Sequence, residues 1–121
     1  MPRAAHLERG RWAESCALAY LNGEGLQLVA RNFRVRLGEL DLVMLDGPLL
    51  VFVEVRYRAS TSYGAAHETV TRAKQRRLHA AAELFRARYP QLAHRACRFD
   101  VVSVTQRNYA PHCNWIRDAF S

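Results

Sequence analysis

Residues 38–58 read GELDLVMLDGPLLVFVEVRYR, and they contain the clearest structural signal in the chain. Two β-rich runs, residues 39–45 and 49–58, flank Asp46-Gly47-Pro48. An Asp-Gly step between such runs is typical of a tight turn, so these residues predict an antiparallel hairpin.

The two faces of this hairpin differ in character, because successive strand side chains point to opposite sides. The apolar face carries Leu40, Leu42, Met44, Leu49, Val51, Val53 and Val55. The mixed face carries Glu39, Asp41, Val43, Leu45, Leu50, Phe52, Glu54, Arg56 and Arg58. On the mixed face both strands are apolar beside the turn and charged away from it.

The register of the hairpin decides how two of the acids meet. If Leu45 lies opposite Leu50, Asp41 lies opposite Glu54, and a shift by two residues makes them diagonal neighbours on the same face. Facing carboxylates with Cβ atoms roughly 5 Å apart repel each other unless something compensates. A shared Mg²⁺ or Mn²⁺ ion would do so. The alternative is a solvated lattice of these acids with Glu39, Arg56 and Arg58. The apolar neighbours of Glu54 favour a specific partner.

The segments around the hairpin complete an α/β pattern. Residues 7–22 repeat apolar side chains at three-to-four spacing and predict a helix that Gly23 ends. Residues 26–35 and 97–105 predict strands, and residues 59–67 a polar loop. Thr71 is the expected N-cap of a helix over residues 71–88, which Pro90 ends. Its expected inner stripe is Val70, Ala73, Leu78, Ala81, Ala82, Leu84 and Phe85.

The order helix, three strands, helix, strand predicts an α/β fold, namely one αβββαβ domain with a mixed central sheet flanked by helices. We expect residues 1–121 to form this single domain, with a core over about residues 10–105 and a C-terminal tail over residues 106–121. Trp115, Ile116 and Phe120 are expected to dock the tail.

Composition excludes several classes of protein. A chain of 121 residues with 50% hydrophobic and 24% charged residues is neither disordered nor fibrous nor membrane-embedded. The charged N-terminal residues lack the apolar segment of a secretion signal, so we expect a cytoplasmic protein. Cys16, Cys97 and Cys113 are odd in number and widely spaced, which argues against a disulfide framework or zinc site.

The charge balance points to an acidic partner. The net charge is +7 from 18 basic and 11 acidic side chains, and Lys74 is the only lysine. Such an excess favours nucleic acid, although a bias toward arginine on a solvated surface would look the same. The second predicted helix carries a basic stripe that could lie along a phosphate backbone. The stripe comprises Arg72, Lys74, Arg76, Arg77, Arg86 and Arg88.

The strings GELDLV (residues 38–43) and VFVEVRYR (residues 51–58) resemble the YraN-like family of uncharacterised bacterial proteins. That family is similar to the PD-(D/E)XK nucleases and, among them, to the archaeal Holliday-junction resolvases. Weaker matches extend the resemblance over about residues 10–120. They are Glu14, Asn32, Tyr63-Gly64, Lys74 and Arg98-Phe99-Asp100-Val101-Val102. The superfamily core has the order αβββαβ.

This resemblance implies that Asp41, Glu54 and Arg56 are catalytic residues, that Asp41 and Glu54 are also metal ligands, and that Glu14 completes the Mg²⁺ or Mn²⁺ site. The sequence departs from the nuclease pattern at Arg56, where the third motif residue is usually Lys. Arginine stays protonated in proteins, so Arg56 would clamp a phosphate instead of accepting a proton. Lys74, on the next helix, is the one amine able to substitute. Arg56, Arg58, Arg72, Lys74, Arg76 and Arg77 are the expected nucleic-acid-binding residues.

Three functions follow as hypotheses. The first is a metal-dependent endonuclease-like protein that hydrolyses phosphodiester bonds of DNA, branched DNA included, in recombination or repair. The second is a non-catalytic nucleic-acid-binding module that keeps the nuclease fold, and the third is a protein-interaction factor with a basic surface. We expect no membrane partner and keep a homodimer as an open expectation. Asp100 lies in an apolar strand, where a structural role is expected.

Overall fold

The computed structural model describes residues 2–58 and 70–121. The elements along the chain are α1 (Pro2–Gly23), β1 (Gln27–Val35), β2 (Gly38–Asp46), β3 (Leu49–Tyr57), α2 (Arg72–Arg88), the short 3₁₀ helix η2 (Pro90–Leu92), β4 (Cys97–Arg107) and β5 (Ala110–Phe120). The loop expected over residues 59–67, with Tyr63 and Gly64, lies outside the described residues.

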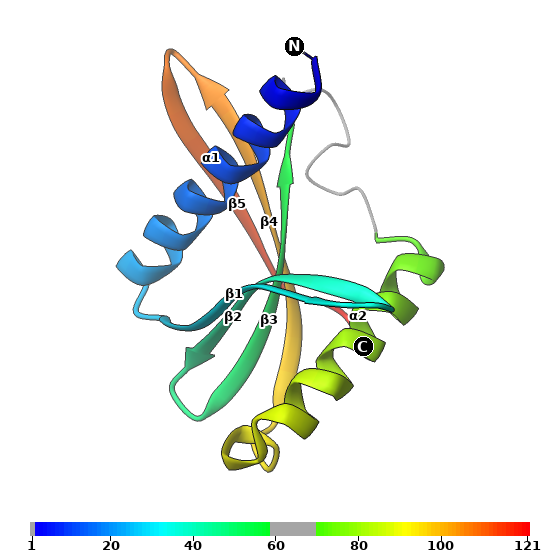
Figure 1. Ribbon diagram of the computed structural model, residues 1–121. Coiled ribbons are helices and arrows are strands. Elements are labelled where there is room, and N and C mark those ends of the chain that lie inside the picture. Colours follow the sequence, from blue (N-terminus) through cyan, green and yellow to red (C-terminus); the bar gives the residue numbers. More distant parts are fainter. Residues whose placement is uncertain (1, 59–69) are drawn as a thin grey trace.

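The strands of the described residues form one five-stranded sheet in the order β1-β2-β3-β4-β5. Neighbouring strands are antiparallel except β3 and β4, which run parallel because α2 provides the crossover between them. Figure 1 shows α1 against one face of the sheet and α2 against the other. The predicted α/β fold with a mixed sheet between helices is confirmed.

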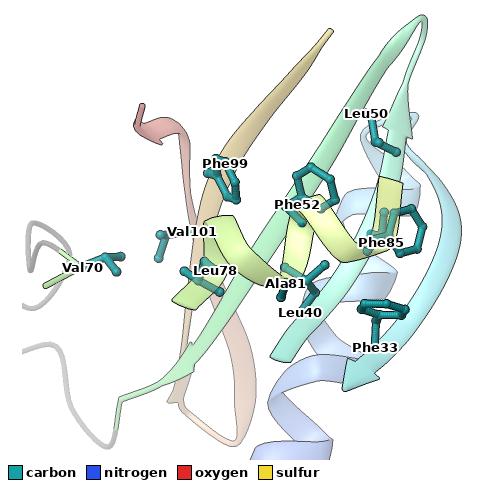
Figure 2. Packing of buried hydrophobic residues seen from close by; sticks show 12 residues of the cluster. Phe33, Leu40, Leu50, Phe52, Val70, Leu78, Ala81, Phe85, Phe99 and Val101 are labelled. Carbon is teal, nitrogen blue, oxygen red and sulfur yellow. The ribbon is translucent and has the colours of Figure 1, made fainter. Parts of the chain in front are cut away.

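Each face of the sheet has its own apolar core. On the α1 side, Ala13, Ala17 and Leu21 of the helix pack against strand residues that include Leu42 and Val53. On the α2 side, Leu78, Ala81 and Phe85 pack against Phe52 and Phe99 (Figure 2). The ring of Phe85 meets those of Phe33 and Phe52 edge to face at centroid distances of 5.2 and 6.0 Å. The amphipathic stripes that predict the two helices therefore point at opposite faces of one sheet.

The second helix begins where the sequence predicts. The backbone N–H of Lys74 donates to Oγ1 of its N-cap residue Thr71 at 3.2 Å. For two members of the expected inner stripe, however, the prediction of burial is wrong. Ala73 and Leu84 are exposed, because the helix buries the narrower stripe of Leu78, Ala81, Ala82 and Phe85.

The predicted hairpin register is confirmed near the turn, where Leu45 pairs with Leu50 and Val43 with Phe52. The prediction that Leu40 shares a face with Leu42 is wrong. Leu40 packs with Val43 on the α2 side, whereas Leu42 packs on the α1 side. On β1, Ala30 and Phe33 likewise share the α2 side although three positions apart.

The alternation of β1 and β2 thus breaks between these positions. Asn32, which lies in the middle of the break on β1, has a φ of 56°. Asparagine tolerates this left-handed conformation better than most residues. The break falls beside Asp41, and beyond it Gly38, at the start of β2, lies next to the backbone of Arg77 in α2.

The tail expected over residues 106–121 is in large part a fifth strand. Asn108 and Tyr109 both have positive φ values, of 49° and 64°, which suits a two-residue hairpin turn between β4 and β5. Trp115 pairs with Val102 and Ile116 with Val101, so these residues attach the segment as expected but within a strand ladder. Its sequence, APHCNWIRDAF, alternates poorly and contains Pro, Asn and Asp, which hides the strand from pattern reasoning.

Two exclusions from the sequence can be compared with the structure. Neither helix in the described part of the chain combines the length and the apolar character needed to span a bilayer. The three cysteines are free thiols, in agreement with the absence of a disulfide framework.

Candidate functional site

Asp41 and Glu54 lie where strands β2 and β3 separate. The paired residues of the two strands end at Leu42 and Val53, one position before Asp41 and Glu54 would face each other. Beyond this point the carboxylate of Asp41 replaces a backbone partner, because its Oδ2 accepts a hydrogen bond from the backbone N–H of Val55 at 2.8 Å. The Asp41 side chain is therefore held in the plane of the sheet, at the opening between the strands.

Two further acids converge on Asp41. Glu14 reaches it from α1, and Glu39 comes from the start of β2. One carboxylate oxygen from each of Glu14, Glu39 and Asp41 lies within 4.8 Å of the other two. Metal–oxygen bonds of roughly 2.0–2.6 Å allow two ligands of one ion to lie about 4–5 Å apart, so these oxygens are spaced as ligands of one cation.

The Glu14 side chain gives a direct test of whether a cation fits. Its Oε1 is buried and has no hydrogen-bond partner, although Nε of Arg31 lies 3.5 Å away. The guanidinium of Arg31 forms an ion pair with this oxygen but no hydrogen bond, so the oxygen can still act as a metal ligand, and a buried oxygen without a hydrogen bond is costly. An all-oxygen donor set is the kind that Mg²⁺ and Mn²⁺ prefer. The residues present therefore fit a hard divalent cation.

The electrostatics of Asp41 reflect this crowding. Removal from solvent is the main reason why its pKa rises from 3.8 to about 8, and the charge of Glu54 adds to the rise. Glu14 and Glu39 raise the pKa further, while the hydrogen bond from Val55 opposes them. Without a cation, Asp41 is thus largely protonated at neutral pH.

Glu54 has a different partner. Its Oε1 lies 2.7 Å from Nζ of Lys74, in an ion pair between β3 and the first turn of α2. The Glu54 side chain is 7% exposed and that of Lys74 43%, so a buried carboxylate is neutralised by an ammonium that solvent can reach. The family resemblance predicts Glu54 as a metal ligand, and the structure places it next to Asp41 but bound to Lys74.

These residues surround a cavity of about 260 Å³ between β2, β3 and α2. Its described lining comprises Gly38, Glu39, Asp41, Glu54, Lys74, Arg77 and Leu78. Gly38 is needed here because a Cβ atom at this position would lie 2.6 Å from the backbone oxygen of Arg77. The close approach of β2 to α2 brings both acids and basic groups to one opening.

The other predicted site residues lie around this cavity in different ways. Arg56 and Arg58 are half-buried on and just after β3, and the cavity lining in the described residues does not include them. Arg72, Arg76 and Arg77 are exposed on α2, and of these Arg77 lines the cavity. The structure therefore brings Glu14, Asp41, Glu54, Lys74 and Arg77 to one region.

Glu39 is the acid that sequence reasoning did not assign to the metal site. A signal was present, since Glu39 lies two residues before Asp41 and shares its predicted strand face. The pattern placed it in a charge lattice with Arg56 and Arg58. In the structure Glu39 Oε2 lies 3.5 Å from Nε of Arg34, its register partner on β1.

Asp100 has a structural role, as expected from its apolar strand. It is fully buried, and its carboxylate accepts hydrogen bonds from Arg98 Nε at 3.0 Å and from Trp115 Nε1 at 2.9 Å. A further bond comes from the backbone N–H of Asp118 at 2.9 Å, at the irregularity where β5 leaves regular pairing with β4. Asp100 thus holds β5 on the sheet and lies apart from the acid cluster.

Comparison with known proteins gives a consistent result along most of the chain. The model of the uncharacterised protein family UPF0102 matches residues 13–104. The chain is 52% identical to a UPF0102 protein of Stutzerimonas stutzeri (strain A1501), with 92% of each chain covered. It is 51% identical to one of Xanthomonas campestris pv. campestris (strain B100), with 97% of this chain and 94% of the relative covered. It is 46% identical to a UPF0102 protein of Nitrosococcus oceani, with 99% of this chain and 97% of the relative covered.

Proposed function

We propose that this chain, which belongs to the uncharacterised protein family UPF0102, is a nucleic-acid-binding, endonuclease-like protein that hydrolyses phosphodiester bonds of DNA with a divalent cation. The observation that carries the proposal is the convergence of Glu14, Glu39 and Asp41 on one point beside Glu54. Acids from a helix and two strands approach one another there at a cost that a cation would offset.

Under this proposal Asp41, Glu14 and Glu54 hold Mg²⁺ or Mn²⁺, and Glu39 joins them. The cation supplies a water of lowered pKa and positive charge next to the reacting phosphate. The chain's own residues bind and orient the substrate. Arginine stays protonated in proteins, so the contribution of Arg56 is a phosphate contact and not proton abstraction.

The basic residues of α2 supply the expected contact with the nucleic-acid backbone. Arg72, Arg76 and Arg77 are exposed on one helix, and Arg77 also lines the cavity. The net charge of +7 supports the same partner, because neutralising phosphates releases counterions and favours binding. Branched DNA is the preferred substrate that the resemblance to junction resolvases implies.

Two observations favour a second function, a non-catalytic nucleic-acid-binding module with the nuclease fold. Arg56 replaces the usual motif lysine, and Glu54 already has a cationic partner in Lys74. A protein of this second kind would bind DNA with a steep salt dependence and cleave none of it.

A cleavage assay separates the two functions. Linear, flapped and four-way DNA is incubated with the protein and Mg²⁺, Mn²⁺ or Ca²⁺, and each reaction is repeated with Asp41→Asn. We expect Mg²⁺- or Mn²⁺-dependent cleavage that falls at least roughly a hundredfold in the variant, since loss of a metal's outer-shell partner alone costs about 10–100-fold.

Glu24→Gln is the matched control, because Glu24 is an exposed acid in the turn after α1 and should leave cleavage unchanged. Cleavage that Asp41→Asn retains, or that needs no divalent ion, would remove the proposed site. Salt-dependent binding without any cleavage would favour the binding module.

A further inference from the structure

The ion pair between Lys74 and Glu54 joins a buried carboxylate to a long, partly exposed lysine side chain. Glu54 lies within β3 between Val53 and Val55, and its register partner on β4 is Val101. Its Oε1 lies 2.7 Å from Lys74 Nζ. A carboxylate in these surroundings needs a cation, and among the described residues Lys74 supplies it.

The backbone of Lys74 is held by the helix cap, whereas its ammonium lies at the end of a long and partly exposed side chain. The N–H of Lys74 is bound to the N-cap Oγ1 of Thr71, which anchors the first turn of α2. The ammonium lies at the end of four methylene groups, and 43% of the side chain is exposed. The head group can therefore leave Glu54 without any change in the helix.

A divalent cation shared by Asp41 and Glu54 would take the place of this ammonium. The charge of Glu54 already acts on Asp41, so the two carboxylates are electrostatic neighbours. A doubly charged ion and an ammonium beside the same carboxylate repel each other. In the described residues, the three oxygens spaced for one ion come from Glu14, Glu39 and Asp41, and Glu54 is engaged by Lys74 instead.

We propose that Lys74 is the resident counter-cation of the metal-free site, which Glu54 exchanges for a divalent cation. The released ammonium stays in the cavity that Lys74 lines together with Arg77, where it can bind a phosphate oxygen. Metal binding and DNA binding are thereby coupled through one side chain, each favouring the other. The inference rests on the proposed function, because it requires a divalent ion at the acid cluster.

Nuclear magnetic resonance on the unaltered protein tests the exchange directly. Lys74 is the only lysine of the chain, so labelled lysine gives one side-chain signal. During titration with Mg²⁺ that signal should move toward the position of a free lysine, with the midpoint that calorimetry gives for Mg²⁺ binding. A Lys74 signal that stays constant while Mg²⁺ binds overturns the proposal.

Lys74→Gln supplies an independent measurement. Loss of the competing charge should tighten Mn²⁺ and Ca²⁺ binding by about tenfold in the absence of DNA, because the ions then no longer compete with an ammonium for Glu54. Lys74→Arg keeps the charge and should bind the ions as the wild type does. Arg107→Gln removes the same charge at the exposed end of β4 and should change the affinity less than twofold.

Binding of DNA completes the test. With Ca²⁺ present the DNA affinity of the wild type should rise, and Lys74→Gln should lose most of that rise. Metal binding that weakens or stays equal in Lys74→Gln would show that Lys74 merely positions Glu54, and the inference would fail while the proposed metal site stands. A wild type that binds no divalent ion would instead refute the metal site itself.

Discussion

The backbone N–H of Val55 donates a 2.8 Å hydrogen bond to Oδ2 of Asp41. One side chain thus completes the pairing of two strands and also belongs to the acid cluster. These two roles can be separated by mutation, because asparagine keeps the hydrogen-bond acceptor and loses the charge.

Asp41→Asn should raise the free energy of unfolding of the metal-free protein above pH 8 by roughly 1–2 kcal/mol, since it removes a charge from crowded acids. Asp41→Ala should lower it by about 1–3 kcal/mol, because the Val55 amide then lacks a partner. Urea unfolding of both variants measures these changes. Equal destabilisation by Asn and Ala would show that the repulsion within the cluster is small.

The raised pKa of Asp41 predicts how stability depends on pH. The folded state holds a proton on Asp41 up to about pH 8, whereas the unfolded state loses it near pH 3.8. The folded state binds more protons in this window, so this contribution is complete below about pH 4 and disappears as the pH rises through about 8. The free energy of unfolding of the metal-free protein should therefore fall over that pH range. In Asp41→Asn this part of the fall should be absent.

Stabilisation by Mg²⁺ should show the opposite trend and increase up to about pH 8, because a cation needs the ionised carboxylate. Thermal unfolding at several pH values, with and without Mg²⁺, measures both trends. Stabilisation by Mg²⁺ that is independent of pH would place the ion away from Asp41.

Arg76→Ala combined with Arg77→Ala should weaken DNA binding and lower the salt dependence of the binding constant. Each lost phosphate contact reduces the slope of log K against log salt by about 0.9, so the pair should remove up to roughly two units. Preference among DNA structures should stay the same. Fluorescence anisotropy at several salt concentrations gives affinity and slope together.

The control pair for this experiment is Arg107→Ala with Arg117→Ala, two exposed arginines of β4 and β5 that carry the same charge. A similar loss of affinity in the control would mean that net charge, and not α2, determines binding.

Asp100→Ala should behave as a structural mutation. It removes one of two acidic partners of Arg98 and the acceptor of Trp115 and of the Asp118 amide, so we expect a loss of about 3–5 kcal/mol in stability, as for other broken buried ion pairs. Chemical denaturation measures the loss. Mg²⁺ affinity at low temperature, where the variant stays folded, should remain that of the wild type. A large drop in Mg²⁺ affinity with intact stability would contradict the structural role.

Local sequence patterns determined much of this fold. The turn at Asp46-Gly47-Pro48 and the alternation on either side set the register that pairs Leu45 with Leu50. The cap at Thr71 and the spacing of Leu78, Ala81 and Phe85 placed the second helix. These signals are readable because turns, caps and apolar periodicity depend on neighbouring residues. The pair Asp41 and Glu54 could be predicted for the same reason, since both lie on one hairpin.

Tertiary structure alone decided the rest. Leu40 lies on the α2 side because the strand alternation breaks at Asn32, and β5 pairs with β4 along a ladder that includes Val101 with Ile116 and Val102 with Trp115. Contacts between distant segments brought Glu14 to Asp41 and Lys74 to Glu54. Such contacts depend on how helices pack across a sheet, and a one-dimensional pattern does not encode those distances. The acids were therefore visible in the sequence, but their cationic partner was determined by packing.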